Sequence, residues 1–321
     1  MSAQPMLIVH QPGLLTTVQD LGRQGWRQSG VGQSGALDYP ALVLANLLAG
    51  NPPHSAVLEI TLGQAEFSVS QDGWFAVTGA DCQATLDGQP VWPGWRLPIK
   101  AGARLKFGAP RHGMRGYLAI AGGIDLPTEL GSRSTHLNAG FGGLAGRALQ
   151  AQDTLPLGTP CHRLTRSLGI RLPAIHPVVR ALPGPEYTSF TPAAQAAFWS
   201  TAWQVSSQSN RMGSRLQGPV LTRSTPHELL SHGVLPGVIQ VPPNGQPILL
   251  LADAQTTGGY PRIACVIETD LHQLAQCRFG STLHFSQCTL EEAWQARQQL
   301  QQQLRRLAWR LDYPHPEEIL P

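Results

Sequence analysis

The sequence contains few charged residues and almost no lysine. Charged residues make up 13% of the 321 residues, the formal net charge is +3, and Lys100 and Lys106 are the only lysines. The arginines are scattered, apart from the adjacent pair Arg305 and Arg306. Nucleic-acid surfaces need clustered cations that neutralise several phosphates. We therefore expect no nucleic-acid partner.

Long apolar segments and paired cysteine motifs are also absent. The longest apolar run, around residues 248–252, is far shorter than the roughly 20 residues that cross a membrane. Residues 1–11 lack the basic start and long apolar core of a signal peptide. The five cysteines form no C-x-x-C pair, which disfavours a disulfide framework and a zinc site. These absences predict a cytoplasmic protein with reduced thiols, no membrane contact and no bound metal.

Two near-matches to known motifs fail on their context. Residues 30–35 fit G-x-G-x-x-G, and Glu59 lies near the position of a ribose-binding acid, but polar residues 27–29 precede the motif where a dinucleotide site needs an apolar strand. We interpret the segment as a glycine-rich loop that shapes a pocket. His227 and His232 are one residue too far apart for H-E-x-x-H, so helix or strand geometry separates them. No P-loop sequence is present to hold ATP.

The 34 glycines and 27 prolines divide the chain into short segments, many of them typical of β-strands. Asp87 and Gly88 lie between two such segments and predict a type I′ hairpin, because both residues tolerate positive φ. The short, closely spaced segments favour antiparallel barrels over alternating strands and helices. Strands are expected at residues 56–62, 65–70, 74–78, 104–107 and 114–120.

Four helices are expected. Asp38 caps the first, which ends near Ala49, and Thr191 opens the second, which runs to about Trp203. A short third helix covers residues 270–279. The last begins with the capping box of Thr289 and Glu292 and runs to about Leu311. It is expected to pack against the chain's own barrel through a stripe made of Leu300, Leu304, Leu307 and Leu311.

Six prolines within residues 156–185 indicate a domain boundary. We predict an N-terminal lobe at residues 1–165, a second lobe at 166–288, and a C-terminal helix with its tail at 289–321.

Three stretches combine polar side chains with glycine: residues 16–23, 209–216 and 253–261. The third follows the apolar run 248–252, so it presents hydrogen-bonding groups on a backbone that a ligand can approach. A turn held by side-chain-to-backbone bonds is the alternative. Arg211 and Arg215 either lie on one helix face and clamp a carboxylate or phosphate, or belong to an Arg–Asp pair that stabilises the fold.

These stretches resemble the allophanate hydrolase subunit 2-like family, which is carboxyltransferase-like and includes the C subunit of 5-oxoprolinase, an antagonist of a kinase inhibitor, and part of urea carboxylase. The resemblance implies a mainly β fold of two cyclophilin-like β-barrel lobes with a few short helices. This chain has Gly32 where the family usually has proline, and Gln152 where it usually has glycine. The matching segments follow the family order at residues 17–23, 30–38, 45–51, 58–59, 78–80, 122–123, 131–135, 142–147, 210–218 and 253–261.

The resemblance further implies the C subunit of an ATP-dependent 5-oxoprolinase, which converts 5-oxoproline, ATP and water to glutamate. Its expected partners are a B-like subunit that is similar to a kinase inhibitor and an A-like subunit that opens the ring, with ATP and Mg²⁺ acting in the complex. We assign Asp253, Gln255 and Arg211 as candidate catalytic residues. The candidate substrate- and phosphate-binding residues are Arg215, Arg133, Thr256, Thr257, Gly258, Gly259 and Tyr260.

Two alternatives remain within the resemblance. The chain could be a component of a biotin-dependent carboxyltransferase acting on urea or a similar amide. Neither Lys100 nor Lys106 is flanked by methionines as a biotin-carrying lysine is, so the carrier would be a separate chain. The other alternative is a non-catalytic antagonist that binds a kinase-inhibitor protein.

Overall fold

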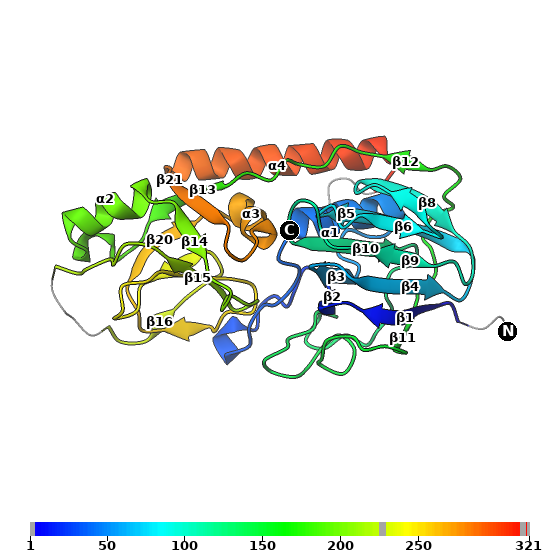
Figure 1. The fold of residues 1–321 in the computed structure, drawn as a ribbon, viewed down its shortest axis with the longest axis horizontal. Helices are drawn as coiled ribbons and strands as arrows, with labels where there is room; N and C mark the ends of the chain where they lie inside the picture. Colours follow the sequence, from blue (N-terminus) through cyan, green and yellow to red (C-terminus); the bar gives the residue numbers. More distant parts are fainter. Residues whose placement is uncertain (1–3, 225–228, 315–318, 320–321) are drawn as a thin grey trace. The chain divides into compact units, whose positions relative to one another are not determined.

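The computed structural model describes residues 4–224, 229–314 and 319, which form mainly β-strands (Figure 1). Contacts divide the chain into two compact units. Unit 1 comprises Met1–Arg23, Ser34–Ala174 and Gln301–Pro321, and unit 2 comprises Gln24–Gln33 and Ile175–Leu300. The main change of unit, after Ala174, falls within the proline-rich stretch. Each unit is made of more than one range of the chain. The division into residues 1–165, 166–288 and 289–321 stays a prediction.

Unit 1 contains two six-stranded sheets. The first has, in spatial order, β11 (Thr154–Pro156), β1 (Met6–Pro12), β4 (Ala65–Val69), β9 (Leu105–Phe107), β6 (Ala84–Leu86) and β7 (Gln89–Val91). The second has β12 (Leu168–Gly169), β8 (Trp95–Ile99), β5 (Gly73–Gly79), β10 (Arg115–Ile120), β3 (Val57–Thr61) and β2 (Leu15–Gln19).

One hydrophobic core lies between these sheets. Phe67 and Leu105 of the first sheet belong to the same buried cluster as Phe75 and Leu118 of the second. Unit 1 therefore encloses its core with two packed sheets, whereas a closed ring of hydrogen-bonded strands occurs in unit 2. The hairpin between β6 and β7 turns at Asp87 and Gly88, whose φ angles of 47° and 81° fit the expected type I′ turn.

Helix α1 (Tyr39–Ala49) packs against β5 and β10. Its residues from Pro40 to Ala49 are all buried, which suits a helix that is apolar on every side. Asp38 caps it as expected, with Oδ1 accepting the Ala41 N–H at 2.9 Å. Gly50 ends it at a φ of 73°, a left-handed conformation that glycine adopts without strain.

Unit 2 is a closed seven-stranded barrel whose pairs are antiparallel except for β13 with β21. A separate two-stranded ribbon joins β16 (His232–Gly233) to β19 (Thr257–Gly258). The barrel order is β13 (Val178–Pro183), β20 (Arg262–Val266), β17 (Val238–Gln240), β18 (Ile248–Leu250), β15 (Gly213–Gln217), β14 (Trp203–Val205) and β21 (Thr282–Gln287).

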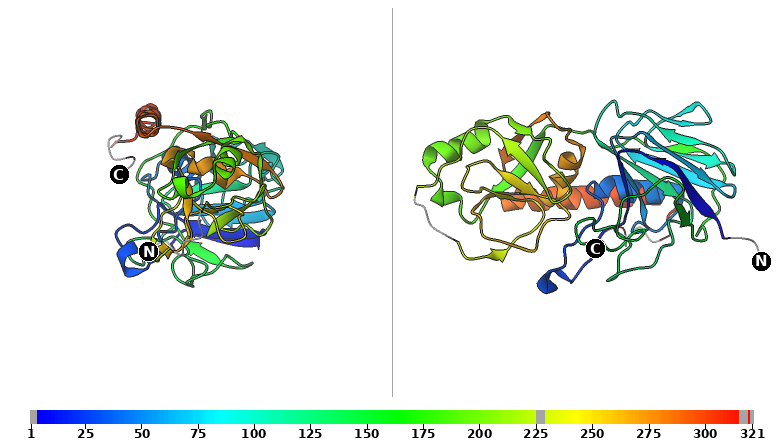
Figure 2. Two further views of the ribbon diagram at one scale, coloured as in Figure 1. Left: turned by 90° about the vertical axis from the view of Figure 1, so that its left-hand side faces the viewer. Right: turned by 60° about the horizontal axis from the view of Figure 1, so that its bottom comes forward.

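Helix α2 (Pro192–Ser200), which is the green helix in Figure 2, packs against β21. Phe198 of this helix stacks on Phe285 at 4.8 Å between ring centroids. The helix ends before the predicted Trp203, because Trp203 is buried at the start of β14 and pairs with Leu283. The remaining short helices are α3 (Leu271–Gln276) and the 3₁₀ turns η1 (Arg27–Ser29), η2 (Tyr187–Ser189) and η3 (Glu268–Asp270).

The mainly β prediction with a C-terminal helix is confirmed, with 31% strand and 18% helix. Helix α4 (Leu290–Arg310) has the expected capping box, in which the Thr289 N–H donates to Glu292 at 2.7 Å and the Glu292 N–H donates to Thr289 Oγ1 at 3.2 Å. Within the described residues, no helix combines the length and apolar character needed to cross a membrane.

The leucine stripe of α4 is partly buried by the chain itself. Leu304 is 2% exposed and Ala308 is fully covered, whereas Leu300, Leu307 and Leu311 are half-buried. Nearer its start, Ala296 joins a small apolar cluster with Ile267 and Cys288. Packing within this chain, as predicted, therefore covers the centre of the stripe.

We expect Leu304→Ala to lower the free energy of unfolding by about 2–4 kcal/mol, because it removes a buried side chain and leaves a cavity. Leu290→Ala is the matched control, since Leu290 is 74% exposed on the same helix. Denaturant titration of both variants measures the difference. Equal stabilities would show that the stripe contributes nothing to the fold.

Candidate functional site

Arg211 and Asp253 form a buried, two-pronged ion pair in unit 2. Strands β15 and β18 pair antiparallel, with Gly213 opposite Leu250, so Arg211 before β15 meets Asp253 after β18. The Arg211 Nε lies 2.9 Å from Asp253 Oδ2, and Nη2 lies 3.1 Å from Oδ1. The Asp253 N–H also donates to the Arg211 carbonyl at 3.0 Å. The structure therefore brings together two of the three predicted catalytic residues.

Burial points to a positioning role for this pair. The Arg211 and Asp253 side chains are 4% and 1% exposed, so neither faces solvent. A fork-to-fork arrangement satisfies the carboxylate through two parallel charge-assisted bonds. Removing either partner would leave the other charge buried, at a cost of about 3–5 kcal/mol. A substitution of Asp253 would thus lower the stability of the fold, and its effect on activity could not be separated from that loss. Exposed residues of the same loop provide the better test of the site.

Arg215 does not share a helix face with Arg211, and that expectation was wrong. Arg215 lies on β15, its N–H donates to Ser209 Oγ at 3.0 Å, and its side chain is exposed. The error arose because the short segment pairs with β18, a long-range contact that local spacing does not reveal. Arg133, the third predicted cation, lies in unit 1.

The predicted binding loop continues from Asp253 into the ribbon of β16 and β19. Gln255, Thr257 and Tyr260 are exposed, while Thr256 and Gly259 are half-buried. These side chains therefore present amide and hydroxyl groups to solvent beside a buried ionic anchor.

Gly258 lies close to the barrel side chain Gln240 under the ribbon. A Cβ at this position would lie 2.7 Å from Gln240 Nε2. Gln240 is 2% exposed and donates through Nε2 to the Tyr260 carbonyl at 3.4 Å. A side chain at Gly258 would displace Gln240, so the glycine lets the loop lie close to the barrel.

Sequence reasoning missed Arg27, which the structure places beside this loop. Arg27 Nη2 donates to the Val234 carbonyl, and the Val234 N–H donates to the Thr256 carbonyl at 3.0 Å. Arg27 Nη1 is buried without a hydrogen-bond partner among the described residues. Burial lowers the pKa of Arg27, which reflects the cost of holding its charge away from water.

His232, on the same ribbon, also has an unused ring nitrogen. Its Nδ1 lies 3.1 Å from the Leu230 carbonyl, while Nε2 is buried and has no partner within the part of the chain that the structure describes. Buried polar atoms normally have partners, so we include Arg27 and His232 in the candidate site beside the exposed loop. The sequence signal for Arg27 is its position just before the glycine-rich segment at residues 30–35.

A second polar cluster surrounds Asp20 in unit 1. Its carboxylate accepts Ser132 Oγ at 2.6 Å, Ser134 Oγ at 2.5 Å, the Arg133 N–H at 2.6 Å and the Gly22 N–H at 2.8 Å. The structure thus joins the family-like stretches 17–23 and 131–135. With four donors on one buried carboxylate, the cluster is saturated and fixes the two loops.

Arg133 is already paired in this cluster. Its Nη2 lies 2.8 Å from Asp125 Oδ1, and its Nε donates to the Leu126 carbonyl at 2.5 Å. Its side chain is one-third exposed. Its part in phosphate binding therefore remains a prediction, and a ligand would have to compete with Asp125.

The glycine-rich segment at residues 30–35 is not a dinucleotide site. The 3₁₀ turn η1 precedes it, whereas the fingerprint needs a strand. Glu59 is 1% exposed on β3 and accepts the Tyr117 hydroxyl at 2.7 Å and the Leu37 N–H at 2.9 Å. Burial, and then the nearby Glu59 carboxylate, raise the pKa of Tyr117 well above its usual value, so this hydroxyl stays a donor.

In the near-match to a metal motif, His227 and Glu228 lie outside the described residues. Within residues 4–224, 229–314 and 319, no group of three or more histidine, cysteine, aspartate or glutamate side chains is arranged to hold a metal ion.

Comparisons with known proteins agree with the family-like segments. Residues 29–287 match the family model described as carboxyltransferase domain, subdomain A and B. The chain is 58% identical over 306 residues to the C subunit of 5-oxoprolinase from Escherichia coli strain K12, covering 95% of this chain and 99% of that protein. It is 46% identical over 277 residues to the C subunit of 5-oxoprolinase from Haemophilus influenzae, covering 86% and 89%.

The structure also superimposes on part of a much larger enzyme. The crystal structure of the Kluyveromyces lactis urea amidolyase matches with a TM-score of 0.87 and 28% identity, covering 94% of this chain and 20% of that one. The match of the family model over most of the sequence, together with the two long relatives, shows that the chain belongs to the carboxyltransferase domain, subdomain A and B, family.

Proposed function

We propose that this chain acts as the C subunit of an ATP-dependent 5-oxoprolinase. The observation that carries the proposal is its similarity to two bacterial proteins that are each named as the C subunit of 5-oxoprolinase, which extends over most of each protein. In the proposal, the chain works in the cytoplasm with a B-like partner and an A-like partner. Its five cysteines form no disulfide, which suits a reducing compartment.

The proposed reaction converts 5-oxoproline, ATP and two waters to glutamate, ADP and phosphate. The lactam carbonyl is a weak electrophile, and transfer of the γ-phosphoryl group of ATP to its oxygen activates the carbonyl carbon. A first water adds to this carbon and the ring C–N bond breaks with the amine as leaving group, which gives an acyl phosphate. A second water hydrolyses the acyl phosphate to glutamate and phosphate. A site for the lactam must hold its carboxylate and its amide in fixed positions. ATP with Mg²⁺ is a co-substrate of the assembled complex in this proposal.

The residues around the β16–β19 ribbon suit a cyclic amide that carries a carboxylate. The Arg27 guanidinium would offer Nη1, which has no hydrogen-bond partner among the described residues, to the substrate carboxylate as a charge-assisted donor. Gln255 and Thr257 offer an exposed amide and hydroxyl for the lactam group. The buried Arg211–Asp253 pair holds the start of this loop in place.

A carboxyltransferase role is the second candidate, and the structural match to the urea amidolyase favours it. In that case the same loop would bind urea or a related amide, and a separate chain would carry biotin. Supplying a carrier whose biotin is already carboxylated to the chain with its partners distinguishes the two. Transfer of the carboxyl group from the biotin to the amide would replace the ATP-dependent hydrolysis of 5-oxoproline.

We expect the purified chain alone to release no glutamate from 5-oxoproline and ATP. Adding the B-like and A-like subunits should restore glutamate formation, measured by a coupled glutamate assay. The control is the B-like and A-like pair without this chain, which should be inactive. Turnover by the isolated chain, or full turnover by the pair, would contradict the proposal.

We expect Gln255→Ala to lower kcat/KM of the assembled complex at least about tenfold, because it removes one oriented hydrogen bond to the lactam. Its thermal midpoint should not change, since Gln255 is exposed. Gln217→Ala, at an exposed position on β15, is the matched control. Equal kcat/KM values for the two variants would remove Gln255 from the site.

We expect Arg27→Gln to raise KM for 5-oxoproline more than about tenfold with a smaller effect on kcat, because a charged bond to the substrate carboxylate is lost. Arg297→Gln, which removes an arginine ion-paired with Glu268 in the same unit, is the control and should keep the wild-type KM. Steady-state kinetics of the complexes measures both. An unchanged KM in Arg27→Gln would exclude Arg27 from substrate binding.

A further inference from the structure

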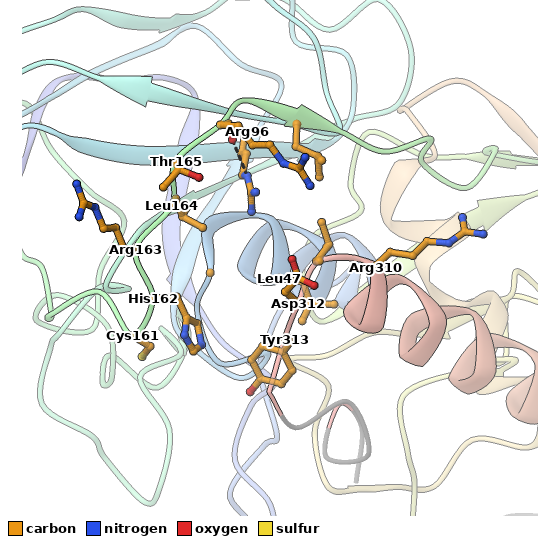
Figure 3. A pocket seen from close by; sticks show the side chains of 14 residues that line it. Leu47, Arg96, Cys161, His162, Arg163, Leu164, Thr165, Arg310, Asp312 and Tyr313 are labelled. Atoms are coloured by element: carbon orange, nitrogen blue, oxygen red, sulfur yellow. Dashed lines mark hydrogen bonds between the residues drawn. The ribbon is translucent and has the colours of Figure 1, made fainter.

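Unit 1 contains a cavity of about 640 Å³ that the proposed function does not use (Figure 3). Three segments line it: the end of α1 at Leu47 and Gly50, the stretch from Cys161 to Leu168, and the end of α4 at Arg310 to Tyr313. Arg96 of β8 reaches it from the second sheet. The volume lies within the range of roughly 300–1,000 Å³ that is typical of small-molecule sites.

The lining of this cavity is strongly basic. It includes the four arginines Arg96, Arg163, Arg166 and Arg310, against Asp312 as the one carboxylate in the lining. The whole sequence carries a net charge of only +3, so this concentration of cations is unusual for the chain. Such a concave, basic surface attracts anions.

Arg96 is the buried cation of the cavity. It is 7% exposed, its Nε donates to the Arg166 carbonyl at 3.1 Å, and its Nη1 donates to the Leu48 carbonyl at 3.3 Å. Among the described residues, Nη2 has no hydrogen-bond partner. The Leu48 carbonyl, near the C-terminus of α1, accepts the bond from Nη1. Nη2 is then the nitrogen that can donate to a ligand.

The charges of Arg96 and Arg166 oppose each other. Burial, and then the Arg166 charge, lower the pKa of Arg96, while Asp312 acts in the opposite direction. Arg96 and Arg166 both line the cavity with one carboxylate, Asp312, in the same lining, so a bound anion would reduce the repulsion between the two cations.

Apolar and aromatic side chains also line the cavity. Leu47 and Leu164 contribute to the lining, and Figure 3 shows the rings of His162 and Tyr313 on the side opposite Arg96. An inorganic anion would leave this part unfilled, whereas a ligand with an organic body would cover it.

We propose that this cavity binds a small organic phosphate, with the phosphate between Arg96 and Arg166 and the organic part against Leu164 and Tyr313. The site lies in unit 1, is separate from the ribbon of unit 2, and does not depend on the proposed function. Phosphate suits the site because its oxygens accept several bonds from two guanidinium groups at once.

Phenyl phosphate and inorganic phosphate are suitable probes, titrated against the full chain at low ionic strength and followed by calorimetry or ³¹P NMR. We expect saturable binding, with phenyl phosphate tighter than inorganic phosphate. Arg166→Gln should weaken phenyl phosphate binding about tenfold or more, as loss of a charged hydrogen bond predicts. Arg166 is exposed, so this variant should keep the wild-type thermal midpoint.

Asp312→Asn should change the affinity for phenyl phosphate in the opposite direction from Arg166→Gln. Asp312 has a φ of 56°, a left-handed conformation that asparagine also adopts readily, so the fold should be kept. Removing the carboxylate from the lining should tighten phenyl phosphate binding severalfold. Arg171→Gln is the control for loss of a positive charge, since Arg171 is an exposed arginine of unit 1 that does not line the cavity.

Absence of saturable binding by the wild-type chain would overturn the proposal. Equal losses in Arg166→Gln and Arg171→Gln would also overturn it, because the effect would then come from overall charge. Equal affinities for phenyl phosphate and inorganic phosphate would contradict the proposal that the organic part of the ligand packs in the cavity.

Discussion

The ion pair between Arg211 and Asp253 is the interaction on which the architecture of the candidate site depends. It joins the approach to β15 with the exit from β18, so the loop that carries Gln255 and Thr257 leaves the barrel from a fixed point. Because both side chains are buried, their attraction is little screened by water, and each depends on the other for its hydrogen bonds. The exposed groups of the loop therefore face solvent from a rigid base.

Buried carboxylates play a comparable part in unit 1. The Asp20 carboxylate accepts hydrogen bonds from the hydroxyls of Ser132 and Ser134. The Glu59 carboxylate accepts hydrogen bonds from the Tyr117 hydroxyl and the Leu37 N–H. A buried carboxylate is tolerated only when donors surround it, so each one fixes the loops that supply those donors. Only 13% of the residues are charged, and several of these charges hold glycine-rich loops in place. Some polar residues in the family-like stretches therefore stabilise the fold and do not contact a ligand.

The two candidate binding regions differ in how their polar groups are satisfied. Around the ribbon, buried atoms of Arg27 and His232 lack partners among the described residues, although their neighbours are bonded. In the cavity of unit 1, the shortage is of negative charge, since Asp312 faces four arginines. A neutral or singly charged amide substrate suits the first region, and a phosphate suits the second, because the density of cations rises from one to the other.

The sequence by itself determined the features that depend on neighbouring residues. The caps of α1 and α4 and the turn at Asp87 and Gly88 follow from local side-chain and backbone chemistry, and the family resemblance gave the mainly β class. Tertiary structure alone decided that Arg211 pairs with Asp253 while Arg215 points outward, since strand pairing set their directions. It also placed Arg27 against Val234, 207 residues away, and assembled the arginine cavity from separate segments. Such contacts arise from packing between distant parts of the chain, and local periodicity carries no record of them.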